Sequence, residues 1–481
     1  MDEHAGIGQW FRPENVLLGL FLAVLAWAPF PYGSNRDWAE LLLALGLGGI
    51  LFAWSGFALI GYAGVSSLSR QLWIPALCVA AALGWGALQS VNLEVLQALS
   101  GLPAKLAAHP VWAMASTVLG SDVGAYVSVD PERTREALLA ASLSVASFLL
   151  AFHLARDRDR ASVLVNGIIV ITLGYAVMAV VVFQFKLDVQ TWLMPDPRVN
   201  FDRLSGPFIN PNHFATFLAL GTLAALGTFV ENVRQSVVWD RGTKVLVRSA
   251  MNALLGGNAF RLAAIVFMLS AILFTQSRAA VIALIVGIFA LAVMLSRGRD
   301  LSDGEAAGRR AIVAILVAVL GISIALSANP LLSRVQEQGL ADTTRTSLIG
   351  STVKAIEAAP LTGLGFGAYE RYYPAFADGT VPGDVDEAHN DVLETLSDLG
   401  VPAGLAYIAA PALLTWMCFA GCSRRRRDRV YPAVGYAASI AVGLHSLADF
   451  GLQIPAVAVT YAALLGAGVA QSWRTNMDLV R

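Results

Sequence analysis

Three arginines and one histidine stand out because each lies beside long apolar stretches in which charged residues are rare. They are Arg203, Arg278, Arg345 and His389. A guanidinium stays charged at physiological pH and its planar fork matches two phosphate oxygens, so a group of arginines predicts a phosphate or diphosphate ligand. An imidazole titrates near neutrality and can take a proton from an attacking hydroxyl. If the fold brings these side chains together, they predict transfer of a phosphate-activated group to an alcohol.

Arg278 is the strongest of these pointers. It lies in the sequence FTQSRAAVIA, between two apolar runs that leave almost no loop to hold it. An arginine near the centre of a bilayer costs at least about 2.5 kcal/mol, and less near the interface, so its side chain should face protein, water or an anion. The alternative is that the side chain extends to the lipid headgroups.

Arg203 opens the segment RLSGPFINPNHFATF, which precedes a predicted membrane helix and also contains His213. Asn-Pro-Asn is turn chemistry, and either Asn210 or Asn212 can cap the helix that follows. A helix N-terminus with an arginine just upstream is a candidate anion site. A capped membrane helix with a surface arginine explains the same residues, and the local sequence does not separate the two interpretations.

Arg345 and His389 lie in a long loop between two predicted spans. A short amphipathic helix is expected to carry Arg345 in its first turn and to stop before Pro360. His389 is expected to open the next helix, with Asn390 beside it and Glu394 just over one turn further on. A histidine in an exposed loop needs no role, but its place on the same side as the three arginines favours one. The nearby sequence GLGFG is only weak evidence for phosphate binding.

His445 and Asp449 are spaced i, i+4 within a predicted span, so they are expected to share one helix face and to bond to each other. That pair could position a substrate or lock two helices together. Arg36, in FPYGSNRDW, is a further candidate cation, for which the evidence of a functional role is weaker. No Asp-rich motif of the D-x-D type stands beside these residues, so charge stabilisation by arginine is favoured over a divalent metal, and no cofactor is expected.

The composition requires lipid as the main solvent. The 481 residues are 56% hydrophobic and 14% charged, with a mean hydropathy of +0.63. A formal net charge of -1 gives no overall basic field, which argues against nucleic acid as a partner. Cys78, Cys418 and Cys422 have no partners placed for a metal site or a disulfide framework and are interpreted as packing residues.

An all-α, polytopic membrane helix bundle of about twelve spans is expected from the apolar runs of roughly 20 residues. The predicted spans are Asn15–Pro31, Trp38–Tyr62, Gln71–Val91, Glu136–Ala155, Ala161–Phe185, Asn210–Val230, Phe260–Thr275, Ala279–Ser296, Ala311–Ala328, Thr395–Ala420, Val430–Leu452 and Pro455–Trp473. The basic links, every second one along the chain, are predicted to be cytoplasmic because cytoplasmic loops carry the excess of Lys and Arg. These links are Arg156–Arg160, Glu231–Asn258, Arg297–Arg310 and Arg424–Arg429. Both termini then lie in the cytoplasm, and the loops Asn92–Arg135, Lys186–Ile209 and Asn329–Glu394 are external.

The ordered motifs GPFINPNHFA, TQSRAA, TR followed by GLGFGAY, and AHNDVLETLSDLG resemble those of the O-antigen ligase and polymerase superfamily, membrane glycosyltransferases of bacterial polysaccharide assembly. The resemblance covers the chain from about Arg203 to Gly400. SVDPERTREAL and FPYGSNRDW are also similar to this group, more often to its exopolysaccharide-type members. The resemblance implies a GT-C-like helical fold with a periplasmic loop and short-helix region, placed in the bacterial inner membrane with its active site facing the periplasm.

The resemblance also implies roles for individual residues. Arg203, Arg278 and Arg345 match positions expected to hold the diphosphate of an undecaprenyl-diphosphate-linked glycan donor, and His389 matches the proposed general base. The acceptor is a lipid A-core or a growing polysaccharide, transfer is inverting and needs no metal, and other polysaccharide-assembly proteins are candidate partners. The supporting residues are Asn210, Asn212, His213, Asn390, Glu394, His445, Asp449 and Arg36.

These expectations divide the chain into N-terminal membrane helices (1–200, with an external loop near 92–135), a catalytic region (201–420, with the large loop 329–394) and C-terminal membrane helices (421–481). The sequence does not settle whether the enzyme is a ligase or a polymerase, although SVDPERT favours a polymerase slightly. The rival from another class is a transporter or flippase for a lipid-linked oligosaccharide, which usually shows polar sites near the membrane midplane and repeats across two halves. A structural scaffold is a third possibility, and it predicts that His389→Ala is harmless in cells.

Overall fold

The computed structural model describes residues 12–64, 67–100, 107–187, 203–236, 258–296, 343–425 and 428–473, with a few isolated residues between 245 and 256 and residue 321. In these residues the secondary structure is helical and contains no strand. The helices are α2 (Pro13–Trp27), α3 (Asp37–Leu59), α4 (Trp73–Gln89), α5 (Leu93–Ser100), α6 (Pro110–Leu119), α7 (Pro131–Leu154), α8 (Arg158–Gln184), α10 (Pro211–Ser236), α12 (Ala259–Thr275), α13 (Arg278–Ser296), α15 (Thr343–Ala358), α16 (Tyr369–Tyr372), α17 (Asp391–Leu399), α18 (Val401–Arg424), α19 (Val430–His445) and α20 (Pro455–Ala470), with short 3-10 turns η1 (Tyr32–Ser34), η2 (Ser67–Leu72), η3 (Tyr373–Ala375) and η4 (Gly451–Gln453).

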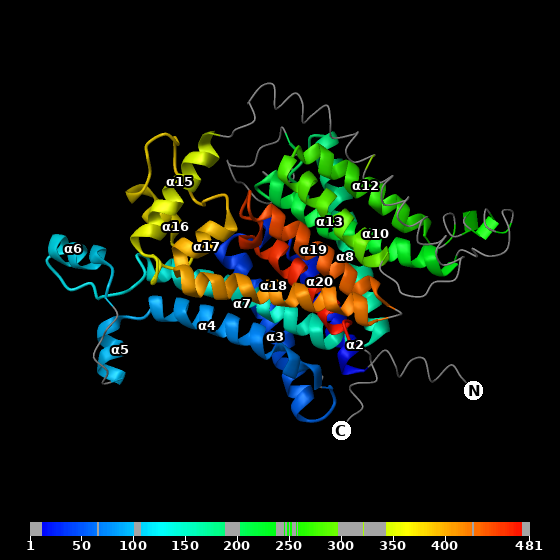
Figure 1. Cartoon of the computed structure of the whole chain (residues 1–481), viewed down its shortest axis with the longest axis horizontal. Coiled ribbons are helices and arrows are strands. Elements are labelled where there is room, and N and C mark those ends of the chain that lie inside the picture. The colour runs from blue at the N-terminus through cyan, green and yellow to red at the C-terminus, as the bar shows by residue number, and fades with distance from the viewer. Residues whose placement is uncertain are drawn as a thin grey trace.

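The chain is a helical membrane protein. Among the described residues, seven helices are long and apolar enough to cross a bilayer, and α2, α12 and α20 are shorter apolar helices of the same bundle. Figure 1 shows the long helices running side by side along the longest axis of the molecule. The expected span Ala311–Ala328 lies outside the described residues.

Helix α10 is the centre of the bundle. Its apolar stretch is enclosed along its whole length, and it packs against α8, α12, α13, α19 and α20. Close pairs around it are α7 with α20, α13 with α19, and α4 with α18. Gly221 and Gly227 on α10 face Thr172 and Val434 so closely that a β-carbon would collide with them. Small residues therefore let the neighbouring helices approach α10, as is common in membrane bundles.

Two predicted spans are interrupted by turns in the structure. The run Thr395–Ala420 is broken at Gly400, whose φ of +76° ends α17 before α18 begins. A side chain there would meet the Leu361 carbonyl oxygen at 2.6 Å, so both the turn and the packing require glycine. The run Val430–Leu452 also stops early, because α19 ends at His445 and a turn leads into η4.

The bundle has two polar ends, which we call the site end and the arginine end. The site end consists of α17, the α12–α13 turn, the start of α10 and the α19–α20 turn, which contact one another through the hydrogen bonds described below. In Figure 1, α15, α16 and α17 lie together at the left of the bundle. The arginine end gathers the ends of α7, α18 and α20, where Arg156 and Arg425 donate to the carbonyl oxygens that close α20.

The links Arg156–Arg160 and Arg424–Arg429 meet at the arginine end. Arg158 forms an ion pair of 2.8 Å with Asp428, and Gln471 donates to the Ala155 and Arg156 carbonyl oxygens at 2.7 and 2.9 Å. Two of the basic links predicted to be cytoplasmic thus share one end of the bundle. The membrane side on which that end lies stays a prediction.

Candidate active site

Asp449 is the centre of the polar cluster at the site end. It lies in the turn after α19 and is fully buried. Asn212 Nδ2 donates to its Oδ2 at 2.5 Å, and the Phe450 backbone N–H donates to Oδ1 at 3.0 Å. Burial alone would raise the pKa of Asp449, but the neighbouring imidazoles of His213, His389 and His445 lower that pKa well below its ordinary value. Asp449 is therefore an ionised carboxylate.

His389 is oriented by that carboxylate. Its Nδ1 lies 3.3 Å from Asp449 Oδ1. Because an ionised carboxylate can only accept, Nδ1 must carry a proton, and in the neutral ring Nε2 then holds the lone pair. The His389 side chain is 35% exposed, so a proton-accepting nitrogen is available to a ligand. Its backbone has φ +52°, an unfavourable value for a residue other than glycine, and such strain is typical of functional positions.

The segment around His389 is fastened to the α19–α20 turn by backbone contacts. The Asp391 N–H donates to the Ser446 carbonyl oxygen at 2.9 Å, and Asn390 Nδ2 donates to the Leu447 carbonyl oxygen at 3.0 Å. Asn390 also caps α17 through the Leu393 N–H. These bonds hold His389 and Asp449 together although 60 positions separate them.

Arg203 is linked to the same carboxylate through Asn212. Its Nε donates to the Thr275 carbonyl oxygen at 2.9 Å, and one terminal nitrogen donates to Asn212 Oδ1 at 3.3 Å. Asn210 Oδ1 accepts from the Asn212 N–H at 2.9 Å, so of the two expected caps of α10 Asn210 takes that role. An unbroken series of side-chain contacts thus runs from the guanidinium through Asn212 and Asp449 to His389.

Arg278 and Arg345 lie beside this series. Arg278 is the first residue of α13, three positions after Thr275, and follows Gln276, whose φ of +55° turns the chain between α12 and α13. Arg345 lies in the first turn of α15, as expected, and acts electrostatically on His445. Both side chains are half-buried. The structure places the three arginines and His389 at the same end of the bundle.

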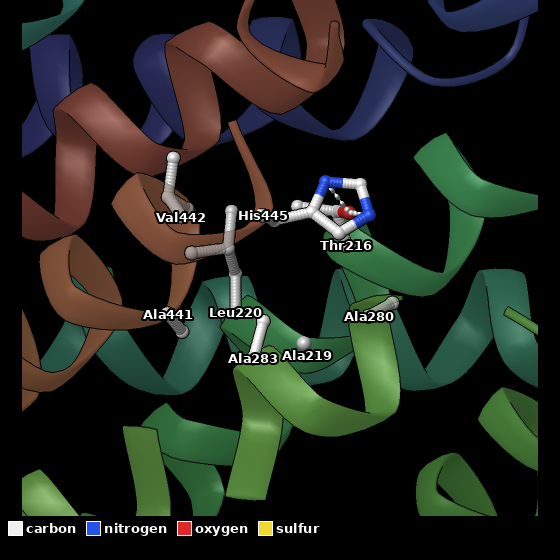
Figure 2. Close-up of a pocket in the computed structure, with 8 residues that line it drawn as sticks. All are labelled: Thr216, Ala219, Leu220, Ala280, Ala283, Ala441, Val442 and His445. Atoms are coloured by element: carbon white, nitrogen blue, oxygen red, sulfur yellow. Dashed lines mark hydrogen bonds between the residues drawn. The ribbon is translucent and has the colours of Figure 1, made fainter. Parts of the chain in front are cut away.

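An apolar pocket lies directly beneath this polar cluster. It is a small pocket between α10, α13 and α19, and the space of about 210 Å³ between its lining side chains includes space open to solvent. Figure 2 shows the ring of His445 with Thr216 at one side and small apolar side chains around the rest. The lining residues are Thr216, Ala219, Leu220, Ala280, Ala283, Ala441, Val442 and His445. Because His445 lines the pocket, the pocket adjoins the buried histidine.

The expected bond between His445 and Asp449 is wrong. It assumed one continuous helix, whereas α19 ends at His445 and Asp449 belongs to the following turn. The side-chain bonds of Asp449 in the described residues go to Asn212 and His389. His445 instead contacts Thr216 Oγ1, at 3.2 Å from Nδ1.

The remaining supporting residues have different surroundings. His213 is 3% exposed, and its Nε2 lies 3.7 Å from Asp449 Oδ1. Glu394 is buried away from the arginines, where it accepts from the Ala388 N–H at 2.8 Å and thus holds the backbone just before His389. Arg36 lies over the ring of Tyr32, at 5.0 Å from its centroid.

A group of buried carboxyls lies behind His389, of which Glu394 was expected as a supporting residue and Asp391 and Asp398 were missed from the sequence. Asp391, Glu394 and Asp398 follow one face of α17, and the signal was their i, i+3, i+7 spacing in an otherwise apolar helix. Burial, reinforced by neighbouring carboxyls, raises the pKa of Asp391 to about 8 and raises the pKa of Glu394 and of Asp398 well above the ordinary range. These groups are neutral at pH 7.

The GLGFG loop packs against protein rather than presenting free N–H groups. Its five backbone N–H groups, from Gly363 to Gly367, donate to Ala359, Ser397, Asp398 and Gln89. A β-carbon on Gly365, at φ +124°, would meet Ser128 Oγ at 2.2 Å. The glycines therefore serve close packing, and the loop offers no cradle for phosphate.

The SVDPERT segment has a structural explanation as well. Asp130 caps α7 through the N–H groups of Glu132 and Arg133, and its other oxygen pairs with Arg371 at 3.3 Å. The segment therefore ties α7 to α16 at the site end. Among the residues that the structure describes, no group of three or more His, Cys, Asp or Glu side chains is arranged to hold a metal ion.

Comparison with known families gives one match. Residues 263–408 match the family model described as O-Antigen ligase. The match includes Arg278, Arg345 and His389, whereas Arg203 and Asp449 lie outside it. A comparison with curated proteins found no match.

Proposed function

Because residues 263–408 belong to the O-antigen ligase/polymerase superfamily, we propose that this membrane protein transfers a glycan from undecaprenyl diphosphate to a hydroxyl group of an acceptor sugar. The observation that carries the proposal is the pairing of His389 Nδ1 with the ionised, fully buried Asp449. That pairing leaves Nε2 with its lone pair on a side chain that a substrate can reach.

In the proposed reaction His389 is the general base. The acceptor oxygen attacks the anomeric carbon of the donor sugar while its proton moves to Nε2. A new carbon–oxygen bond forms on one face of that carbon as the bond to the diphosphate breaks on the other, so the configuration inverts. Asp449 stabilises the imidazolium that results and holds the ring in place.

The arginines would stabilise the leaving diphosphate. The electron pair of the breaking bond adds negative charge to the phosphate oxygens, and Arg203, Arg278 and Arg345 meet that charge without a proton transfer. A hydrogen bond to a charged group contributes about 1.5–3 kcal/mol, so loss of one arginine should weaken transfer more than 10-fold. We propose this charge stabilisation in place of a divalent metal, and activity that persists in excess chelator would support it.

The pocket in Figure 2 has both polar and apolar lining residues. Its alanine, leucine and valine side chains begin immediately below the polar cluster. The proposal also predicts that the site end faces the periplasm, with both termini in the cytoplasm and about twelve spans in a GT-C-like arrangement.

The test is transfer by purified protein in nanodiscs, with an undecaprenyl-diphosphate-linked glycan and an acceptor saccharide. His389→Asn should lower transfer at least about 100-fold while donor binding persists, because a general base contributes about 10²–10⁴-fold. His109→Asn is a matched control, since His109 caps the distant helix α6 and asparagine is also a good cap. Full transfer by His389→Asn would refute the proposed role of His389.

The same chemistry serves a ligase and a polymerase, which differ in the acceptor. We favour a polymerase slightly, because of the SVDPERT segment. Deletion of the gene separates them: accumulation of single repeat units indicates a polymerase, and loss of all lipid A-linked glycan indicates a ligase. A flippase, the alternative, would move labelled donor across a vesicle membrane without acceptor and irrespective of His389.

A further inference from the structure

Two imidazoles approach one carboxylate oxygen at the site end. His389 Nδ1 and His213 Nε2 lie 3.3 and 3.7 Å from the same atom, Asp449 Oδ1. The ring of Phe450 packs edge-on against both, with centroid distances of 4.9 Å to His389 and 4.5 Å to His213. One imidazole is partly exposed, whereas the other is 3% exposed and cannot meet a substrate without rearrangement.

We propose that His213 is a positioning residue, which acts through Asp449 to set the orientation and basicity of His389. This inference rests on the proposed function of His389 as the base. It assigns to the histidine of the NPNHF segment a task distinct from diphosphate binding.

The energetic reason is the cost of an ionised carboxylate that is fully buried. Such a charge is stable only when donors surround it. Asn212 Nδ2 and the Phe450 N–H supply two neutral donors, and His389 supplies a third that must also be free to change its charge during the reaction. His213 is a fourth donor, one that does not contact the substrate. Its 3.7 Å separation exceeds a hydrogen bond in the free protein, and contacts of this kind commonly shorten when the reacting complex forms.

Loss of the His213 N–H should change the pH dependence of activity in one direction. The carboxylate then has fewer donors and attracts a proton onto His389 more strongly. Since only unprotonated His389 can act as base, the acidic limb of the activity profile moves to higher pH. Other charged or titratable groups act within the cluster, namely Arg203 through Asn212, His445 on Asp449, Asp449 on Asp391, and Arg345 on His445. All of them remain in a His213 variant, so a comparison with the parent protein isolates His213.

Two substitutions separate positioning from packing. His213→Phe keeps a ring against Phe450 but has no N–H, whereas His213→Gln loses the ring and keeps a donor that can reach Asp449. If His213 acts through its N–H, Phe should lower kcat about 10–100-fold and raise the pH of the acidic limb by about 0.5–1 unit, and Gln should restore most of kcat. Donor KM should stay within about 2-fold in both, because neither substitution touches the diphosphate site.

The experiment measures kcat, donor KM and the pH profile of purified protein in nanodiscs, with thermal unfolding as the check on folding. If Phe matches the parent in kcat and pH profile, or if Gln is as poor as Phe while both fold, the positioning role is refuted. His389→Asn is measured alongside. If that variant keeps its activity, the proposed function itself has failed, whatever the His213 variants do.

Discussion

Two sets of buried carboxyls lie close together at the site end and take opposite protonation states. Asp449 is ionised because the His389 N–H donates to it and a second imidazole, that of His213, lies beside it. Asp398 is neutral, with the Tyr372 hydroxyl and the Gly367 N–H as partners and Glu394 as a neighbouring carboxyl. Both aspartates are buried, so burial does not distinguish them.

The difference shows that neighbouring side chains decide which carboxyl works. Imidazoles stabilise a negative charge and can themselves exchange a proton, whereas nearby carboxyls repel it. Pairs of titratable groups whose environments separate their pKa values commonly mark acid–base roles. This difference indicates that Asp449 acts together with His389, whereas the carboxyls of α17 stabilise the structure around it.

Removing the charge of Asp449 should have the largest effect. Asp449→Asn keeps the size of the side chain but gives the His389 N–H a weaker acceptor. Its new amide NH2 group would also face the NH2 group of Asn212, so that two donors would meet. We expect kcat to fall about 10²–10⁴-fold with little change in donor KM, as measured by glycan transfer. Asp398→Asn is the matched control. If Asp398→Asn lowered transfer as much as Asp449→Asn, the distinction between a catalytic and a supporting carboxyl would be wrong.

Replacement of the neutral Asp398 should affect stability rather than catalysis, and only when its polar atoms are removed. Asparagine resembles the protonated acid, since its oxygen can accept from the Gly367 N–H and its amide can donate to Tyr372. Alanine leaves the Gly367 N–H without its acceptor, whereas the Tyr372 hydroxyl keeps Ser397 Oγ as a partner, so the free energy of unfolding should fall by about 1–3 kcal/mol. Unfolding in mild detergent measures this, and equal loss in both variants would show that Asp398 is charged.

Stability should decrease as the pH rises. The pKa of Asp391 is about 8 in the folded protein and near 3.8 when unfolded, so between these values the folded state holds a proton that the unfolded state releases. Each rise in pH within that window therefore favours unfolding, whereas the lowered pKa of Asp449 confines its own contribution to acidic pH. The apparent Tm should therefore fall between about pH 4 and pH 8. Asp391→Asn should reduce the change of Tm with pH. If the Tm of that variant changes with pH as much as that of the parent protein, groups other than Asp391 cause the effect.

Ser446→Ala should have the smallest effect. It removes one hydrogen bond of 2.6 Å to Asp391 Oδ2, while the Leu452 N–H remains near the same oxygen. We expect a loss of about 0.5–1.5 kcal/mol in the free energy of unfolding and unchanged transfer. A transfer defect larger than about 5-fold would mean that the support carboxyls take part in the reaction.

Hydropathy predicted most of the fold because lipid imposes a simple rule on span length. The predicted starts and ends of spans such as Ala279–Ser296 and Phe260–Thr275 lie within one residue of α13 and α12. The predicted spans were wrong at Gly400 and after His445, because the apolar sequence continues through a turn at both places. In both places tertiary contacts, and not local sequence, determine where the helix ends.

The site was predictable only in part. Unusual charge beside apolar runs pointed to Arg203, Arg278, Arg345 and His389, whose roles remain proposals. The pairing of His389 with Asp449 could not be predicted, since it joins residues 60 positions apart through the contacts of Asn390 and Asp391. The i, i+4 rule instead suggested a local partner, His445, that the turn removes.

The left-handed backbone at His389 restricts which substitutions can be interpreted. Glycine and asparagine adopt φ near +52° at little cost, whereas alanine and β-branched residues do so with strain. A saturation library at this position will therefore score two properties at once, chemical competence and conformational tolerance. Variants that express well but are inactive should be concentrated in those two residue types, and poor expression of the others would say nothing about proton transfer.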